Sequence, residues 1–272
     1  MRFESCPLRP ATIYMAKHLH PISAVMLAHQ YSPLLEKVIQ SINWCDEIIV
    51  VTSEEVKEIS DLCRRVGAKH FFRKFDGFGT QKQFAISQAS HDWILSIDSD
   101  EIVSTGCQNR IETLMGTLSL DSNSAFRIQR KLVFLNEPMS FSGTPCKPIR
   151  LFNKTKAKMN SSPVHEEIET NGPVGYIQEP IYHYSYSSLD DYFFKFNRYT
   201  TLAAQELHRE KKTTNSLLVW GRLPFLFLRR YLLQLGFLDG QKGFVWSVLS
   251  AWYSSVKYLK LQELNLKSKK AN

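Results

Sequence analysis

Three carboxylates close a strongly apolar stretch, "HDWILSIDSDEIV" at residues 91–103. Asp98, Asp100 and Glu101 follow the run WILSI within four positions. On an extended segment, side chains two residues apart point the same way, so Asp98 and Asp100 can converge on one cation. Carboxylate oxygens are the ligands that hard divalent cations prefer. The alternative is that the acidic residues simply end a strand and cap the next helix, because Asp is common at such turns.

Two rival motifs are excluded by their spacing. A P-loop ATPase also places Asp-Glu after a strand, but the chain contains no G-x-x-x-x-G-K-[ST] sequence, and GFGTQK at 77–82 does not fit it. A phosphatase of the haloacid dehalogenase type requires D-x-D-x-[TV], and Ile102 occupies the last of these positions. The carboxylates therefore belong to a different kind of site.

The elements around the carboxylates follow an alternating pattern. Short apolar runs predict strands, and segments with helical spacing lie between them. This strand–helix repeat is typical of a parallel α/β sheet, which binds ligands beyond the carboxyl ends of its strands. The carboxylates follow the last of these strands and so lie at the ligand-binding edge. The predicted strands are 22–28, 47–53, 68–74 and 92–98, and the predicted helices are 33–42, 54–66 and 81–89.

Composition limits the class of protein. With 272 residues, of which 43% are hydrophobic, the chain can bury a full core and is globular. Its five cysteines include no Cys-x-x-Cys pair, which indicates free thiols in a reducing compartment. The N-terminus lacks the apolar stretch of a signal peptide, and the charge-free run 243–256 is shorter than the roughly 20 residues of a membrane span. We therefore expect a cytoplasmic protein.

The basic charge is concentrated in the C-terminal part of the chain. From Lys195 onward there are 14 Lys and Arg against 4 Asp and Glu, whereas residues 1–194 carry 20 against 22. This basic part is also rich in Trp, Phe, Leu and Tyr, a combination that fits either nucleic acid or an anionic membrane surface. Neither a recognition helix nor a sheet of aromatic platforms is evident, so we expect no nucleic-acid binding.

Several motifs together resemble a known family. They are "EIIVV", "VGAKHFFRKFDGFGTQKQFAISQASHDWILSIDSDE", "VHEE" and "HYSYSSLDDYFFKFNRYTTLAA". In this order they are similar to the bacterial family 2 glycosyltransferases of lipopolysaccharide core biosynthesis, from about Ile22 to about Leu261. The resemblance implies a GT-A fold, an α/β fold with a Rossmann-like, mostly parallel sheet. It also implies an inverting sugar transfer in which Asp-x-Asp holds Mg²⁺ or Mn²⁺ against the donor's pyrophosphate.

The resemblance also implies roles for individual residues. Asp98 would contact the donor's ribose and Asp100 the metal, while Lys82 would reach the nucleotide. The alternative for Lys82 is a solvated helix lysine. His183 would be a further metal ligand, or else a structural histidine among tyrosines.

An inverting transfer needs a base that takes the proton of the acceptor hydroxyl. The candidate is Glu166 in "PVHEEIE", with Glu167 as its competitor and His165 beside it to contact a phosphate or orient the carboxylate. The alternative is an acidic surface strand, because EEIE alternates as an exposed strand does.

The chain departs from the family's pattern at the nucleotide end. The first strand continues as "LAHQYSP", so Ala28 lies where the family begins its donor-binding segment. The second strand ends in "VTSEEVKE", where Thr52 replaces the aspartate that reads the base. We therefore keep a uridine diphosphate sugar as the expected donor, with altered base recognition, a different donor, or a degenerate transferase without turnover as alternatives.

These observations predict two domains with different tasks. Residues 20–185 form the GT-A domain, and residues 186–265 form a helical, basic extension. Because the expected acceptor is a lipid-anchored saccharide, the extension is expected to bind the anionic inner face of the cytoplasmic membrane through residues such as Arg222, Arg229 and Arg230. The alternative is a helical pair packed on the domain or on a second subunit.

Overall fold

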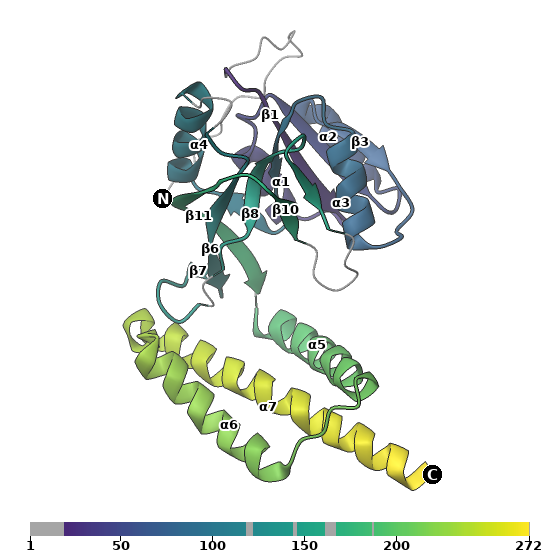
Figure 1. The fold of residues 1–272 in the computed structure, drawn as a ribbon, viewed down its shortest axis with the longest axis vertical. Coiled ribbons are helices and arrows are strands. Elements are labelled where there is room, and N and C mark those ends of the chain that lie inside the picture. Colours follow the sequence, from purple (N-terminus) through teal and green to yellow (C-terminus); the bar gives the residue numbers. More distant parts are fainter. Residues whose placement is uncertain (1–18, 118–121, 144–145, 161–166, 187, 272) are drawn as a thin grey trace. The chain divides into compact units, whose positions relative to one another are not determined.

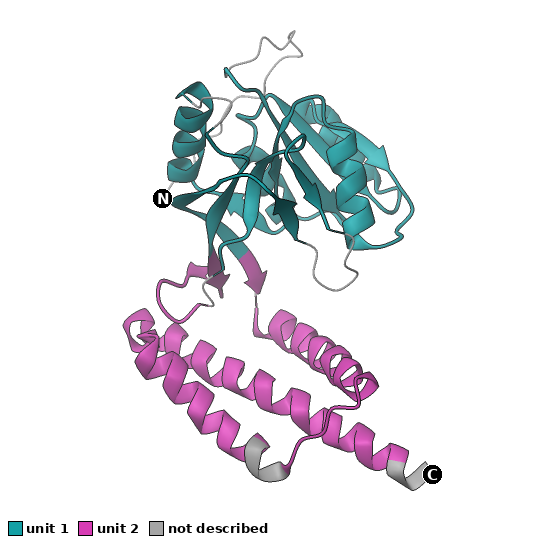
Figure 2. Ribbon diagram, in the orientation of Figure 1, with its two compact units in different colours: residues 1–130, 145–183 teal, residues 131–144, 184–272 magenta. Residues whose placement is uncertain are grey.

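The structure, a computed structural model, describes residues 19–117, 122–143, 146–160, 167–186 and 188–271, without the side chains of 216–218 and 269–271. The chain divides into two compact units (Figure 2). Unit 1 comprises Met1–Arg130 and Pro145–His183, and unit 2 comprises Lys131–Thr144 and Tyr184–Asn272.

The first half of unit 1 alternates parallel strands with helices (Figure 1). The strands lie in the order β3-β2-β1-β4 and pair in parallel, so that Ala24 of β1 lies between Ile48 of β2 and Leu95 of β4. Their carboxyl ends therefore share one edge of the sheet. The elements are β1 (Ile22–Ala28), α1 (Pro33–Ser41), β2 (Glu47–Thr52), α2 (Lys57–Val66), β3 (Lys69–Phe72), α3 (Phe78–Ser87) and β4 (Trp93–Ser96).

Local sequence signals explain where these elements lie. Alternate residues of β1 face opposite sides of the sheet. Met26 packs in one apolar cluster with residues of α1, α2 and α4 (Thr105–Thr117), and Val25 packs in another with residues of α3. Helix α1 begins at Pro33, where the Ser32 hydroxyl accepts the Leu35 N–H at 3.1 Å. Helix α2 ends at Val66, and the Gly67 that follows has a φ of 73°, a conformation that favours glycine.

The second half of unit 1 extends the sheet with antiparallel strands. Strand β8 (Ile149–Asn153) pairs with β4, followed by β6 (Ala125–Phe134), β11 (Val174–Tyr186) and β5 (Glu101–Val103). Strand β7 (Glu137–Pro138) pairs with β6. Strands β9 (Ala157–Met159) and β10 (Ile168–Thr170) form a separate antiparallel pair. The segment that carries the carboxylates connects β4 to β5, and Glu101 is the first residue of β5.

The predicted alternation of strands and helices is confirmed. Each predicted element is present, and strand 22–28 matches β1 at both ends. The fourth strand ends at Ser96, two residues before the prediction, because the chain enters a turn at that point. The apolar residue Ile97 is buried although it lies outside the strand, so its hydrophobicity does not mark the strand's end.

Unit 2 is largely helical and has its own core. Its elements are α5 (Leu189–Arg209), α6 (Ser216–Leu228), the π-helix η1 (Arg229–Leu233), the 3₁₀ helix η2 (Gly236–Asp239) and α7 (Gly240–Ala271). Helix α5 is capped by Ser188, whose hydroxyl accepts the Asp191 N–H at 3.1 Å. The buried aromatic residues Phe134, Tyr192 and Trp246 pack together. Within the described residues, no helix combines the length and the hydropathy needed to span a bilayer.

One buried carboxylate joins the parallel strands at their amino-terminal edge. Glu47, at the start of β2, accepts hydrogen bonds from Ser23 of β1 and from the Ser90 backbone and hydroxyl before β4, and it pairs with Lys69 of β3. Burial by itself raises the pKa of the carboxyl, but the hydrogen bonds from these partners outweigh it and lower the pKa to about 2.

We predict that Glu47→Gln lowers the free energy of unfolding by about 2 kcal/mol at pH 7, because a charged acceptor with several donors is lost. A depressed pKa contributes stability above the unfolded value of 4.5, and this contribution disappears as the pH falls towards about 2. The difference between wild type and variant in denaturant unfolding should therefore shrink over this range. The exposed Glu58→Gln on α2 is the control. A difference that does not change with pH would contradict the assignment.

Candidate functional site

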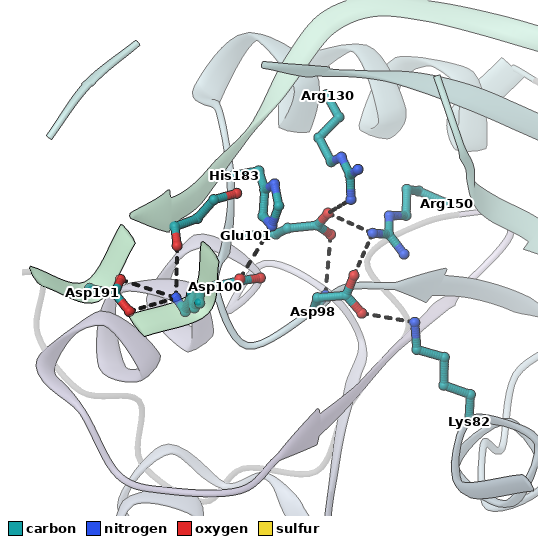
Figure 3. A network of polar contacts seen from close by, with 10 residues as sticks. Lys82, Asp98, Asp100, Glu101, Arg130, Arg150, His183 and Asp191 are labelled. Atoms are coloured by element: carbon teal, nitrogen blue, oxygen red, sulfur yellow. Dashed lines mark hydrogen bonds and ion pairs between the residues drawn. The ribbon is translucent and has the colours of Figure 1, made fainter. Parts of the chain in front are cut away.

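The carboxylates of the stretch 91–103 lie in a tight turn at the carboxyl end of β4. The Glu101 amide donates to the Asp98 carbonyl oxygen at 3.0 Å, and the Asp98 amide donates to Glu101 Oε2 at 3.2 Å. In this turn the two aspartates have different partners, because Asp98 contacts Lys82 and Arg150 whereas Asp100 contacts His183 (Figure 3). The convergence of Asp98 and Asp100 on one cation stays a prediction.

Arg150 is a buried arginine that holds this turn. Its Nη2 lies 2.6 Å from Asp98 Oδ2 and 2.5 Å from Glu101 Oε1. Strand β8 brings it there, because the next residue, Leu151, pairs with Leu95 of β4. The Arg150 side chain is only 8% exposed, and a charge so remote from water must be paired. Burial alone lowers the pKa of the guanidinium, but the two carboxylates outweigh it and raise that pKa above its ordinary value.

Asp98 lies between two cations. Its Oδ2 contacts Arg150, and its Oδ1 lies 2.9 Å from Lys82 Nζ on α3 (Figure 3). Burial raises the pKa of Asp98, but the charges of Arg150 and Lys82 outweigh it and hold this pKa well below its usual range. Asp98 is therefore a permanent carboxylate whose charge is balanced. The structure thus brings together Lys82 and Asp98, two of the residues expected at the donor.

Glu101 is the buried partner in this network. Its side chain is fully buried, and its Oε1 lies 3.4 Å from Arg130 Nη1 on β6 in addition to its contact with Arg150. Neither arginine, nor the supporting role of Glu101, was predicted from the sequence. A signal was available for Arg150, because an arginine inside the apolar strand IRLFN must find a buried carboxylate. No comparable signal marks Arg130.

The Asp100 carboxylate contacts His183. Its Oδ2 lies 3.2 Å from His183 Nε2, and both side chains are partly exposed, at 39% and 23%. The β5–β11 register explains the contact, since His183 pairs with Glu101. The structure therefore brings together the two residues that the resemblance assigns to the metal.

The donor set tests whether a metal fits there. No group of three His, Cys, Asp or Glu side chains able to hold a metal occurs in the described part of the chain. Mg²⁺ usually takes one or two carboxylates and fills its other positions with phosphate oxygens and water. Asp100 and His183 offer a carboxylate oxygen and an imidazole nitrogen at a partly exposed edge. They fit a cation whose other coordination positions are filled by phosphate oxygens and water. They do not by themselves complete a coordination sphere.

The two remaining residues expected at the nucleotide lie side by side but are buried. Ala28 pairs with Thr52 at the ends of β1 and β2, and their exposed fractions are 0% and 1%. Thr52 Oγ1 lies 2.9 Å from His70 Nε2, and burial lowers the pKa of His70. The following residues, His29 and Ser53, are accessible at this edge, with His29 Nδ1 3.3 Å from Ser53 Oγ. These two residues were not predicted from the sequence, although His29 directly follows a predicted strand and Ser53 is the last residue of one.

The expected base falls where the structure is not described. Glu166 and His165 lie outside the described residues. The competing Glu167 is exposed, and its amide donates to Asn160 Oδ1 at 3.1 Å. From Glu167 to Thr170 exposed and half-buried residues alternate, as expected for a surface strand.

The fold and the acidic turn agree with the similarity of the chain to known proteins. Residues 23–183, more than half of the chain, match glycosyl transferase family 2, and the chain belongs to this family. It is therefore a glycosyltransferase with the expected GT-A fold, in which the parallel sheet carries the antiparallel strands described above.

Relatives match along nearly the whole chain. An uncharacterized glycosyltransferase of Rickettsia conorii is 31% identical over 91% of this chain and 92% of its own length. An uncharacterized glycosyltransferase of Rickettsia felis is also 31% identical, over 92% of this chain and 93% of its own length. A protein of Rhizobium meliloti named as the lipopolysaccharide core biosynthesis glycosyltransferase LpsC is 25% identical over 89% of this chain and 92% of its own.

We predict that Arg150→Met lowers the free energy of unfolding by about 3–5 kcal/mol, because the fully buried Glu101 would lose its main partner and the half-buried Asp98 would lose one of its two cations. Denaturant unfolding of the purified protein measures the loss. Arg127→Met on β6 is the control, because Arg127 is exposed, and it should cost less than about 1 kcal/mol. Equal stability of the two variants would show that the turn does not depend on Arg150.

Proposed function

We propose that this glycosyltransferase moves a hexose from a uridine diphosphate sugar to a lipid-anchored saccharide, with inversion and with the help of Mg²⁺ or Mn²⁺, in lipopolysaccharide core assembly. The observation that carries the proposal is the acidic turn after β4, where Asp98 is fixed by two cations and Asp100 is directed to His183. The similarity to the Rhizobium meliloti protein supports the class of acceptor.

The donor side follows from the contacts of Asp98. An ionised carboxylate has about four acceptor positions, and Lys82 and Arg150 use one on each oxygen. The others are available to ribose hydroxyls, and the fixed carboxylate needs no reorganisation to accept them. Lys82 is positioned beside it to balance the negative charge of the diphosphate. Because Thr52 is buried against His70, recognition of the base falls to the neighbouring His29 and Ser53.

Asp100 and His183 would hold the cation. When bound, the cation would stabilise the negative charge that develops on the leaving diphosphate. His183 would supply an imidazole nitrogen and Asp100 a carboxylate oxygen to this cation. The 3.2 Å separation of Asp100 Oδ2 and His183 Nε2 supports this shared role.

The acceptor side requires a base opposite the leaving group. Glu166 is our candidate, because it belongs to the segment between β9 and β10, which comes after the donor-side strands in the chain. The neighbouring His165 would orient its carboxylate. The basic, apolar helices of unit 2 would hold the enzyme on the anionic inner face of the cytoplasmic membrane, where a lipid-anchored acceptor resides.

A second candidate function is binding of a nucleotide or sugar without turnover. The observation in its favour is Thr52, which stands in place of a base-reading aspartate and whose hydroxyl is already bonded to His70. Metal-dependent hydrolysis of a panel of nucleotide sugars separates the two functions, since only the transferase releases a nucleoside diphosphate.

For this panel we predict that Asp100→Asn reduces Mn²⁺-dependent hydrolysis and transfer by at least about 10²-fold, because it keeps the shape of the side chain but removes the charge that binds the cation. The melting temperature should change little, since Asp100 is partly exposed. Asp61→Asn on α2 is the control, with a comparably exposed carboxylate remote in sequence from the turn. Full metal-dependent activity of Asp100→Asn would refute the assignment.

For the base, Glu166→Gln keeps hydrogen-bonding capacity but cannot accept a proton. We predict that transfer falls by about 10²-fold or more while the affinities for donor and metal stay nearly unchanged. Single-turnover transfer and equilibrium binding of the donor separate these effects. Glu167→Gln is the matched control, and normal transfer by Glu166→Gln together with loss in Glu167→Gln would move the base by one residue.

A further inference from the structure

The helical part of unit 2 exposes an unusual amount of apolar surface where α6 is followed by α7. We call residues 225–244, which include the end of α6, η1, η2 and the first turn of α7, the hairpin tip. Leu233 is 78% exposed, the most exposed of the large apolar residues there. Soluble surfaces rarely carry contiguous apolar patches of this kind unless they bind something. The exposed large apolar residues are Phe225, Leu228, Leu232, Leu233, Leu235, Phe237, Leu238 and Phe244.

Ring contacts show that several of these residues belong to one surface. Tyr231 of η1 contacts Phe237 of η2 and Phe244 of α7, with ring centroids 6.3 and 5.6 Å apart. Phe227 of α6 stacks on Tyr231 at 5.4 Å and contacts Phe244 at 5.7 Å. Phe237 and Phe244 nevertheless remain 43% and 47% exposed. Phe227, Tyr231, Phe237 and Phe244 therefore form one aromatic cluster at the tip, of which Phe237 and Phe244 are exposed.

The backbone of the tip is fixed although its side chains are exposed. The Asp239 carboxylate accepts hydrogen bonds from the backbone amides of residues 140–142 and from the Ser142 hydroxyl. Gly243 packs so tightly that a Cβ there would lie 1.9 Å from the Gly236 carbonyl oxygen. Leu235 has a φ of 57°, a costly conformation for leucine that places an apolar side chain at the turn. The apolar surface is thus held in place by polar contacts.

The charged residues around the hairpin tip indicate which kind of partner it binds. From Ser216 to Tyr258 the chain has five cationic residues and a single carboxylate, Asp239. That carboxylate is buried, 8% exposed, and taken up by backbone amides. Arg229 is exposed on the tip. Lys242 of the tip pairs with the exposed Glu137 of β7, so its charge is balanced there. An apolar surface that also carries the exposed cation Arg229 complements an anionic lipid surface.

We infer that the hairpin tip inserts into the interfacial layer of an anionic bilayer without crossing it. This inference rests on the proposed membrane-bound acceptor and specifies the surface that reaches the membrane. A second copy of the chain is a poorer occupant, because a two-fold contact brings the same patch of both copies together and opposes Arg229 to its own equivalent. Arg230 has a different task, since its guanidinium donates to the Ser142 carbonyl oxygen and is half-buried.

The test is sedimentation of the full chain with phosphatidylcholine vesicles that contain or lack phosphatidylglycerol. Leu233→Gln/Leu238→Gln should weaken partition into the anionic vesicles by about tenfold or more, because both exposed side chains would lose their apolar contact. Arg229→Gln should weaken it by about fivefold at low salt and have little effect at high salt. Leu202→Gln/Leu266→Gln is the matched control, with exposed fractions of 51% and 59% outside the tip, and should bind as wild type does.

The outcomes separate this inference from the proposed function. Vesicle binding needs neither donor nor acceptor, so Asp100→Asn should bind vesicles as wild type does even though it loses turnover. The tip variant should keep its melting temperature and its metal-dependent hydrolysis of the donor. The inference would be overturned if the tip variant bound vesicles as wild type does. If this variant also had a different molecular mass in sedimentation velocity, the tip would be a surface for self-association instead.

Discussion

The buried Arg150 guanidinium is the constraint on which the arrangement of the site depends. A charge with 8% exposure must be paired, and the carboxylates within reach belong to the turn that follows β4. Strand β8 carries Arg150 alongside β4, and the guanidinium then holds Asp98 and Glu101 together. The turn is therefore not a free loop. Its geometry is determined by an ion network that crosses from the parallel to the antiparallel half of the sheet.

The three acidic residues of the turn have different contacts. Glu101 is fully buried and serves the fold, whereas Asp98 is shared between the fold and the surface because Lys82 reaches it from α3. Asp100 takes no part in the arginine contacts and is directed to His183 on β11. Three carboxylates within four positions thus have three environments. Under the proposed function, these environments correspond to support, donor binding and cation binding.

Unit 2 uses a carboxylate in a related way. Asp239 is buried, and burial by itself raises its pKa, but hydrogen bonds from the amides of residues 140–142 outweigh this effect and lower it. The carboxylate is satisfied by the backbone, so it adds no exposed negative charge to the hairpin tip. Polar interactions therefore fix the frame in both units. In unit 2 they leave apolar side chains such as Leu233 exposed, which a hydrophobic core alone does not explain.

The sequence by itself determined the alternation of strands and helices in unit 1, because apolar periodicity and caps such as Ser32 and Gly67 are local signals. It also located the acidic turn at the ligand-binding edge, since strand order and direction fix that edge. The contacts of the carboxylates could not be predicted, because they depend on β8 and β11, which are distant in sequence. Only tertiary structure gave Asp98 and Asp100 their different partners, since Lys82 and Arg150 reach Asp98 from α3 and β8, whereas His183 reaches Asp100 from β11.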